Sequence, residues 1–203
     1  MITGLLLISS LCTQCGPAVS PATTQAIIKV ESGGKPYVIN DNTTRKSFSP
    51  TSKTEAIHIA SELLSQGHSL DLGIMQINST HLQKMNLTLD ELFDPCRNIN
   101  IGTNLLAEAY RRNNNGESGS TVLFKALSAY NTGSAWRGPD YINRILKAAG
   151  ATYRVAVINP PPEKRRSIAT AVRKSKAGTA SVRAENHSLF FPASNLSQNV
   201  QGL

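Results

Sequence analysis

Signals that begin and end helices recur through the first 150 residues, and they limit the fold more than any other feature of the sequence. Ser20 followed by Pro21 is typical of a helix start, and Gly33 is typical of a helix end. Ser52 and Thr88 each lie three residues before a glutamate, which is the spacing of a capping box. Apolar residues return at helical spacing between these signals. The pattern predicts about six helices, over residues 21–30, 52–67, 88–93, 95–112, 121–130 and 139–149.

Polar and turn-forming residues separate these helices. Residues 37–53 predict a loop or a small hairpin, because they are polar and rich in turn residues. Residues 70–79 (LDLGIMQINS) have the composition of an apolar strand that is interrupted by a glycine and by polar side chains. We therefore expect a compact array of about six helices with one polar excursion.

The C-terminal end differs from the rest of the chain. Three prolines follow Asn159, and residues 163–203 show little apolar periodicity, so we expect a largely disordered tail. Residues 151–203 hold eight Lys/Arg and two Asp/Glu, a net charge of +6 out of +8 for the chain. A solvated basic tail is favoured over nucleic-acid binding. The expected layout is a start segment at 1–11, a domain at 12–155 and a tail at 156–203.

The first ten residues, MITGLLLISS, leave two interpretations open. They are apolar like a secretory signal, but no Lys or Arg precedes the apolar run. A degenerate signal and a first helix that is incorporated into the domain both fit. No stretch reaches the roughly 20 apolar residues of a spanning helix, so we expect no transmembrane segment.

Three cysteines, Cys12, Cys15 and Cys96, favour a structural disulfide over a metal site. Cys12 and Cys15 form a C-x-x-C pattern, but no second ligand pair follows at a spacing suited to zinc. We expect one of this pair to bond Cys96, which would place the protein in an oxidising compartment. No metal and no cofactor are expected.

Glu31 is the first candidate for chemistry. It lies one helical turn beyond Ile27 and so borders the apolar stripe of its helix, at the helix C-terminus. Both placements favour a neutral carboxyl, which is the state that a general acid needs. The alternative is an ordinary helix-end charge that pairs with Lys29 or Lys35.

Two later segments carry polar side chains in apolar surroundings. Met75 and Gln76 interrupt the segment at 70–79, and a buried glutamine needs several hydrogen-bond partners, which a sugar with amide groups can supply. Tyr130 and Asn131 end a helix just before Gly133. The alternatives are that Met75 packs in the core, Gln76 bonds the backbone, Tyr130 is a core aromatic and Asn131 a helix cap.

Taken in order, these segments resemble the motifs of a known family. The segments Glu31–Gly33, Gly73–Asn78 and Ala129–Gly133 resemble the three motifs of the soluble lytic transglycosylases, and the segment from Tyr141 resembles the family's later tyrosine helix. The flanks of the cysteines, CGP at 15–17 and FDPCRNI at 93–99, are similar to those of lytic transglycosylases from type IV secretion and conjugation systems. The resemblance covers about residues 12–150.

The resemblance implies a lysozyme-like, mainly helical α+β domain with a glycan cleft between lobes. It makes Glu31 the catalytic acid and base. It also implies substrate-binding roles for six residues: Ser32, Met75, Gln76, Tyr130, Asn131 and Tyr141. The cysteine flanks imply a disulfide between Cys15 and Cys96, with Cys12 as the rival partner.

The family uses one carboxylate where ordinary glycosidases use two. The N-acetyl group of the substrate is thought to assist departure of the leaving sugar, and the muramoyl 6-hydroxyl then displaces it. Asp41 and Asp71 are the acids nearest to the motifs, and neither occupies a position that the resemblance marks as catalytic. Asp71 is expected to be a structural turn or cap residue.

Three hypotheses follow for function. The first is a periplasmic peptidoglycan lyase that opens the cell wall for a secretion or conjugation machine, with glycan strands and subunits of that machine as partners. The second is a lysozyme-type hydrolase of the same polymer. The third is a glycan-binding scaffold subunit without activity, which the combination of Glu31 with the polar motif residues disfavours.

Overall fold

The computed structural model describes residues 2–155, with side chains from residue 8 onward. The expectation of a disordered basic tail at 156–203 lies outside these residues. The chain forms two compact units that divide between Leu105 and Leu106. The sequence had predicted one domain over residues 12–155.

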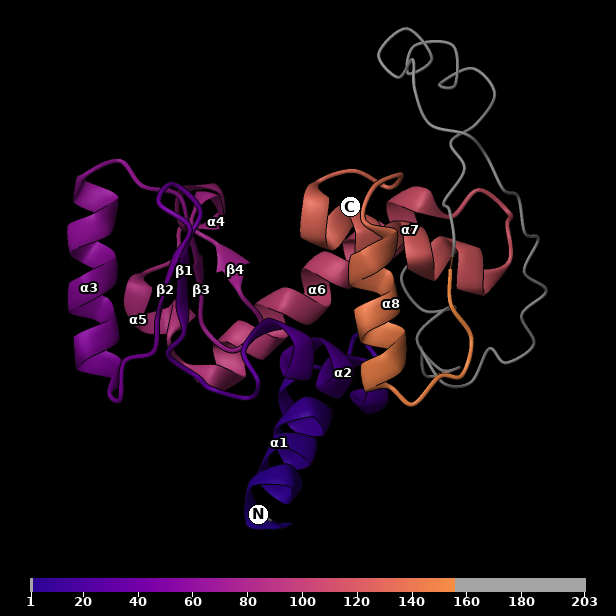
Figure 1. Cartoon of the computed structure of the whole chain (residues 1–203), viewed down its shortest axis with the longest axis horizontal. Helices are drawn as coiled ribbons and strands as arrows, with labels where there is room; N and C mark the ends of the chain where they lie inside the picture. The colour runs from indigo at the N-terminus through magenta and orange to yellow at the C-terminus, as the bar shows by residue number, and fades with distance from the viewer. Residues whose placement is uncertain (1, 156–203) are drawn as a thin grey trace, which may run out of the picture. The chain divides into compact units, whose positions relative to one another are not determined.

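The first unit begins with two helices that contact each other, α1 (Ile2–Cys15) and α2 (Pro21–Glu31) (Figure 1). The backbone N–H of Thr23 donates to the Ser20 side chain at 3.4 Å, and Pro21 takes the first helical position, as the Ser-Pro signal predicted. The chain start is helical, which is compatible with both interpretations of residues 1–11.

A four-stranded antiparallel sheet follows α2, in the order β2-β1-β3-β4. β1 (Ile39–Asp41) and β2 (Lys46–Phe48) form the small hairpin predicted for residues 37–53. Residues 70–78 form two strands, β3 (Leu70–Leu72) and β4 (Ile77–Asn78), joined by a turn. The chain can reverse there because Gly73 and Gln76 both have positive φ, 81° and 54°.

Three further helices belong to this unit. α3 (Lys53–Ser65) and α5 (Leu89–Leu92) contact each other, and both begin at the predicted caps (Figure 1). The Thr88–Glu91 capping box has both of its hydrogen bonds. The sequence did not predict α4 (Thr80–Lys84), because five residues are too few to show a helical period and its N-cap residue makes no side-chain cap bond.

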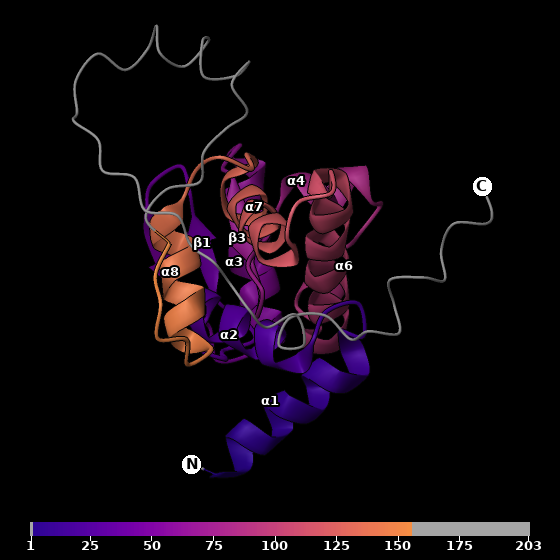
Figure 2. The same ribbon diagram turned by 90° about the vertical axis from the view of Figure 1, so that its right-hand side faces the viewer.

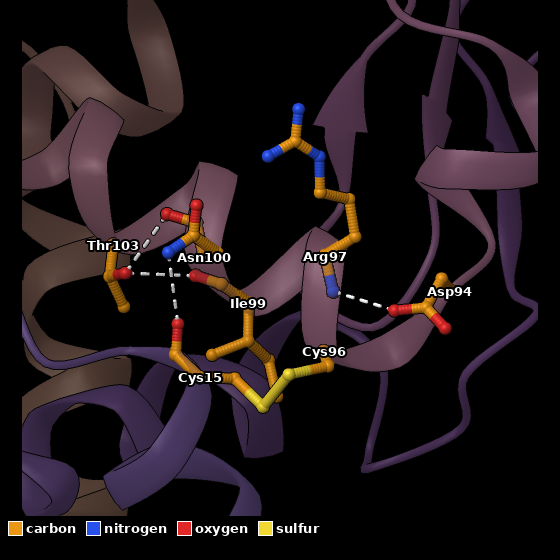
Figure 3. Close-up of a disulfide and its surroundings, with 7 residues drawn as sticks. All are labelled: Cys15, Asp94, Cys96, Arg97, Ile99, Asn100 and Thr103. Carbon is orange, nitrogen blue, oxygen red and sulfur yellow. Dashed lines mark hydrogen bonds between the residues drawn. A yellow bond between two sulfur atoms is a disulfide. The ribbon is translucent and has the colours of Figure 1, made fainter.

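A long helix, α6 (Pro95–Asn113), begins in the first unit and ends in the second. The Asp94 carboxylate accepts the Arg97 N–H at 2.7 Å and so caps its first turn (Figure 3). In that turn Cys96 forms a disulfide with Cys15 at the end of α1, with 5.1 Å between the Cα atoms. This is the pairing that the cysteine flanks implied. Cys12 is left as a buried thiol.

The second unit contains the end of α6 with α7 (Gly119–Thr132) and α8 (Pro139–Ala148), and these last two helices contact each other (Figure 2). Gly133, at φ 71°, ends α7 in the left-handed conformation. After α8 the chain folds back. The side-chain amide of Asn143 bonds both the N–H and the carbonyl of Val155, each at 2.8 Å.

The structure confirms the expected fold class. Residues 2–155 contain eight helices and four short strands, so the described part of the chain is mainly helical with one small sheet. Within these residues no helix combines the length and the apolar character that crossing a bilayer requires.

Candidate active site

Glu31 is the last residue of α2 and is partly exposed. It lies one turn beyond Ile27, whose side chain is fully buried, so the acid stands at the edge of the buried stripe as the sequence predicted. Gly33 and Gly34 follow with positive φ, 63° and 85°, and turn the chain away from the helix. A carboxyl group is thereby held at a helix end, beside the core and within reach of solvent.

Ser32 fastens the turn after Glu31 to a distant segment. Its hydroxyl donates to the carbonyl oxygen of Ile74 at 2.7 Å and accepts the Gly34 N–H at 3.2 Å. The side chain is buried. Ser32 was expected to bind substrate. Its hydroxyl hydrogen is instead used inside the protein, where it joins the residue after Glu31 to the turn at 73–76.

Asn98 on α6 holds that turn in place, and the sequence reasoning missed it. Its amide N–H groups donate to the carbonyls of Leu72 and Leu92, at 3.0 and 2.7 Å, and its oxygen accepts the Met75 N–H at 2.8 Å. The side chain is completely buried, and all three bonds go to backbone groups. The only signal in the sequence is a lone polar residue on an otherwise apolar helix face.

Met75 departs from its expected role. Its side chain is fully buried, and its sulfur lies 2.8 Å from the position that a Cβ on Gly102 would occupy. Met75 therefore packs against α6, which is the core alternative that the sequence left open. A side chain with no exposed surface cannot line a cleft, so we withdraw the prediction that Met75 contacts glycan.

Gln76 combines the two interpretations that the sequence left open. Its amide nitrogen donates to the carbonyls of Gly73 and Val38, at 2.8 and 3.1 Å, so it does bond the backbone. Its Oε1 atom is buried and has no hydrogen-bond partner among the residues that the structure describes. A buried acceptor without a donor is costly, and a ligand N–H or O–H would remove that cost.

The remaining predicted residues belong to the second unit. Tyr130 and Asn131 lie in the last turn of α7, where Tyr130 is partly exposed and Asn131 is exposed. Tyr141 is on α8 and is buried, with the Arg144 guanidinium 5.6 Å from its ring centre. Asn131 and Tyr141 both lie near Gly138, because a Cβ there would be 3.8 Å from Asn131 Oδ1 and 3.8 Å from Tyr141 Cβ.

Comparison with known proteins identifies the family. A family model described as the transglycosylase SLT domain matches residues 12–139. The chain belongs to the transglycosylase SLT domain family.

Several curated proteins resemble this SLT chain. Protein virB1 of Agrobacterium fabrum (strain C58) is 36% identical over 138 residues, which cover 67% of this chain and 56% of that protein. Type IV secretion system protein virB1 of Brucella abortus biovar 1 is 35% identical over 171 residues, 80% of this chain and 72% of the relative. Invasion protein IagB of Salmonella typhi is 31% identical over 110 residues, 52% of this chain and 64% of that protein. The match thus spans little more than half of the Agrobacterium relative. No solved structure matches the chain.

Two further acids lie near the SLT motifs, and the structure gives both of them partners. Asp41 accepts hydrogen bonds from the backbone N–H groups of Thr43 and Thr44, from the Thr44 hydroxyl at 2.5 Å and from His68 at 2.9 Å. Burial raises the pKa of Asp41, but these hydrogen bonds outweigh it and lower the pKa to about 2. Asp71 accepts the Asn78 amide at 2.7 Å. Asp41 is thus tied to the turn that follows β1. Asp71 lies in the middle of β3, and its partner Asn78 lies opposite it in β4, so Asp71 forms a cross-strand pair and is not the turn or cap residue that was expected.

The described residues hold no cluster of three or more His, Cys, Asp or Glu side chains that could bind a metal ion.

Proposed function

We propose that the protein is a peptidoglycan lytic transglycosylase. It cleaves the β-1,4 bond between N-acetylmuramic acid and N-acetylglucosamine and leaves a 1,6-anhydromuramoyl end. The observation that carries the proposal is the placement of Glu31, whose turn is fastened through Ser32 to Ile74 in a chain of the SLT family.

In the proposed reaction Glu31 acts twice. Its carboxyl first donates a proton to the glycosidic oxygen, and the bond from that oxygen to the muramoyl C1 breaks. The resulting carboxylate then takes the proton of the muramoyl 6-hydroxyl, whose oxygen bonds C1. One proton leaves Glu31 and one returns, so no water is consumed. Asp41 does not serve as a second, water-activating carboxylate in this reaction, because both of its carboxylate oxygens accept hydrogen bonds from the protein.

The substrate contacts are assigned as follows. Gln76 offers its buried Oε1 to a donor on the sugar, while its amide nitrogen keeps its two backbone bonds. Tyr130 and Asn131 bind the saccharide and its acetamido group, as the family motif implies. The buried Tyr141 is the third residue proposed for this part of the site. Ser32 positions the acid, and Met75 supports the turn from the core.

The cellular setting is proposed from the names of the relatives. The Brucella relative is a type IV secretion system protein, and we propose that this chain opens the wall for a machine of that kind, in the periplasm. The Cys15–Cys96 disulfide supports an oxidising compartment. Glycan strands and subunits of the machine are the proposed partners. Residues 12–155 are proposed as the catalytic domain.

Product analysis tests the activity. Purified protein is incubated with peptidoglycan, and the soluble fragments are analysed by mass spectrometry. Anhydromuramoyl ends, ~18 Da lighter than hydrolytic ends because no water is added, are the expected products. Reducing ends in their place would make the protein a hydrolase, and no released fragments would favour a glycan-binding scaffold.

The acid itself is tested by Glu31→Gln. The amide keeps the shape of the side chain but cannot donate the proton, so turnover should fall by ~10²–10⁴-fold or more while glycan binding remains. Glu62→Gln is a matched control, since Glu62 is an exposed glutamate in the last turn of α3. Full activity of the Glu31→Gln variant would refute the assignment of the acid.

A further inference from the structure

A buried cation anchors two loops of the second unit. The side chain of Lys125 on α7 is only 3% exposed. Its ammonium pairs with the Glu117 carboxylate and lies 4.6 Å from the ring centre of Trp136. A buried ammonium is costly unless it is compensated, and here a carboxylate and an aromatic face compensate it. Lys125 therefore holds the loop before α7 and the loop after it.

The second of these loops, residues 133–138 (GSAWRG), is called the tryptophan loop below. Ser128 on α7 holds it from inside, because the buried Ser128 Oγ accepts the Arg137 N–H at 2.9 Å. The same hydroxyl lies 2.6 Å from the Ser134 carbonyl, to which it can donate. Thr132 accepts the Ser134 N–H at 3.2 Å. The backbone is thus fixed on both sides of Trp136.

The tryptophan loop ends at the residues to which saccharide binding was assigned. A Cβ on Gly138 would lie 3.8 Å from Asn131 Oδ1 and 3.8 Å from Tyr141 Cβ. Both are ordinary contact distances, and the nearest atom is the Thr132 methyl carbon at 3.3 Å, so the requirement for glycine comes mainly from the φ of 79°. Trp136 is therefore two residues along the chain from Gly138, whose surroundings include Asn131 Oδ1 and Tyr141 Cβ.

The indole of Trp136 has the properties of a sugar-contacting group. It is partly exposed, although its ring also packs against the Lys125 ammonium. A pyranose has an apolar face of C–H groups and a rim of hydroxyls, and an indole has an apolar body and an N–H at its edge. A ring already held by its loop loses little conformational freedom when a ligand binds.

We propose that Trp136 stacks against a pyranose ring of the glycan strand, next to the sugar bound by Asn131 and Tyr141. Lys125 and Ser128 act as positioning residues that hold the indole in place. The proposal rests on the proposed function, because the glycan is its substrate. It adds a substrate contact outside the motifs from which the activity was inferred.

The chain contains one tryptophan, so its fluorescence reports on this loop alone. Full-length protein carrying Glu31→Gln is titrated with the tetrasaccharide of N-acetylglucosamine, and binding is followed in parallel by calorimetry. A saturable change of tryptophan emission and protection from acrylamide quenching are expected, with the affinity that calorimetry measures. Calorimetric binding without any change in emission would overturn the proposal. So would a response that requires peptide stems and is absent with peptide-free peptidoglycan strands.

Kinetics on peptidoglycan form a second test, which does not depend on tetrasaccharide affinity. Trp136→Ala should raise the half-saturating substrate concentration about tenfold and leave kcat within about twofold, because stacking assists binding more than chemistry. Trp136→Phe should recover most of the loss. Tyr153→Ala, which removes another exposed aromatic from the same unit, should behave as wild type. A half-saturating concentration unchanged in Trp136→Ala would overturn the proposal.

The Lys125→Met variant tests whether Lys125 positions the indole for binding. It also tests the proposal if the Trp136→Ala variant does not fold. It keeps the apolar stem and removes the charge, so the indole should become more accessible to acrylamide and glycan binding should weaken with kcat unchanged. Equal quenching and equal binding would refute the positioning role. If the wild type releases anhydro ends but the variants show none of these effects, only this inference fails. If the wild type releases no anhydro ends, the proposed function fails.

Discussion

Gly73 shows how a single residue shapes the site. A Cβ at this position would lie 2.3 Å from the Asn98 amide nitrogen and 2.7 Å from the Leu92 carbonyl, far inside contact distance. Its φ of 81° adds a second requirement for glycine. The turn that carries Gln76 can therefore approach α6 closely only because residue 73 has no side chain.

The requirement for a positive φ and the requirement for space can be separated by comparing Gly73 with Gly67. Gly67 has nearly the same φ, 80°, but nothing lies within 4 Å of the Cβ that it lacks. Gly67→Ala should cost only the backbone strain, about 1–2 kcal/mol of the free energy of unfolding. Gly73→Ala should cost at least about 1–3 kcal/mol more, because the Asn98 network must move. Urea unfolding of the two variants measures the difference, and equal losses would show that the contact with Asn98 can relax freely.

At the scale of elements, the disulfide links α1, which leads into α2, with α6, whose Asn98 holds the turn at 73–76. Cys15 ends α1, Cys96 lies in the first turn of α6, and 81 residues separate them along the chain (Figure 3). Asn98, which bonds the turn at 73–76, lies only two residues beyond Cys96. The Asn100 side chain adds a hydrogen bond to the Cys15 carbonyl at 3.3 Å.

Replacing Cys15 and Cys96 together by serine should lower the free energy of unfolding by about 2–5 kcal/mol, because a long loop is released in the unfolded chain. Cys12→Ala is the control, and it should cost much less. Burial raises the pKa of the Cys12 thiol to about 11, so the folded protein should not react with thiol reagents near neutral pH. Mass mapping without reductant should recover the 15–96 pair, and a free thiol at Cys96 would contradict the structure.

For the whole molecule, the question is how much of the chain the activity needs. The family match ends at residue 139, while Asn143 binds Val155 through two hydrogen bonds, so the folded part extends past the match. Residues 156–203 carry most of the net charge that lies beyond residue 150 and are outside the described structure. We propose that this tail serves in docking or wall adhesion.

Two truncations test this division. A chain that ends after Asn159 keeps the Val155 contacts and should release anhydro ends from isolated peptidoglycan at a rate near that of the full chain. A chain that ends after Ala149 loses both bonds to Asn143 and the burial of Val155, so it should unfold at lower urea concentration. A loss of activity or solubility already after Asn159 would mean that the tail packs on the domain.

The sequence by itself determined the features that depend on nearby residues. Caps such as Ser52 and Thr88, and prolines such as Pro21, act on backbone groups within one turn, so most helices could be predicted from them. Glu31 could be placed at the edge of an apolar stripe for the same reason. The order of the motifs was enough to infer the family and, through the cysteine flanks, the disulfide.

Tertiary structure decided the features that depend on residues far apart in the chain. Ser32 donates a hydrogen bond to Ile74, 42 residues away, and Asn98 donates one to Leu72, 26 residues away. No pattern in the neighbouring residues predicts such partners. Met75 is buried against Gly102, and the Lys125 ammonium lies over the ring of Trp136. Burial and hydrogen bonding are properties of positions in the folded chain, so these roles became visible only when the distant segments had been brought together.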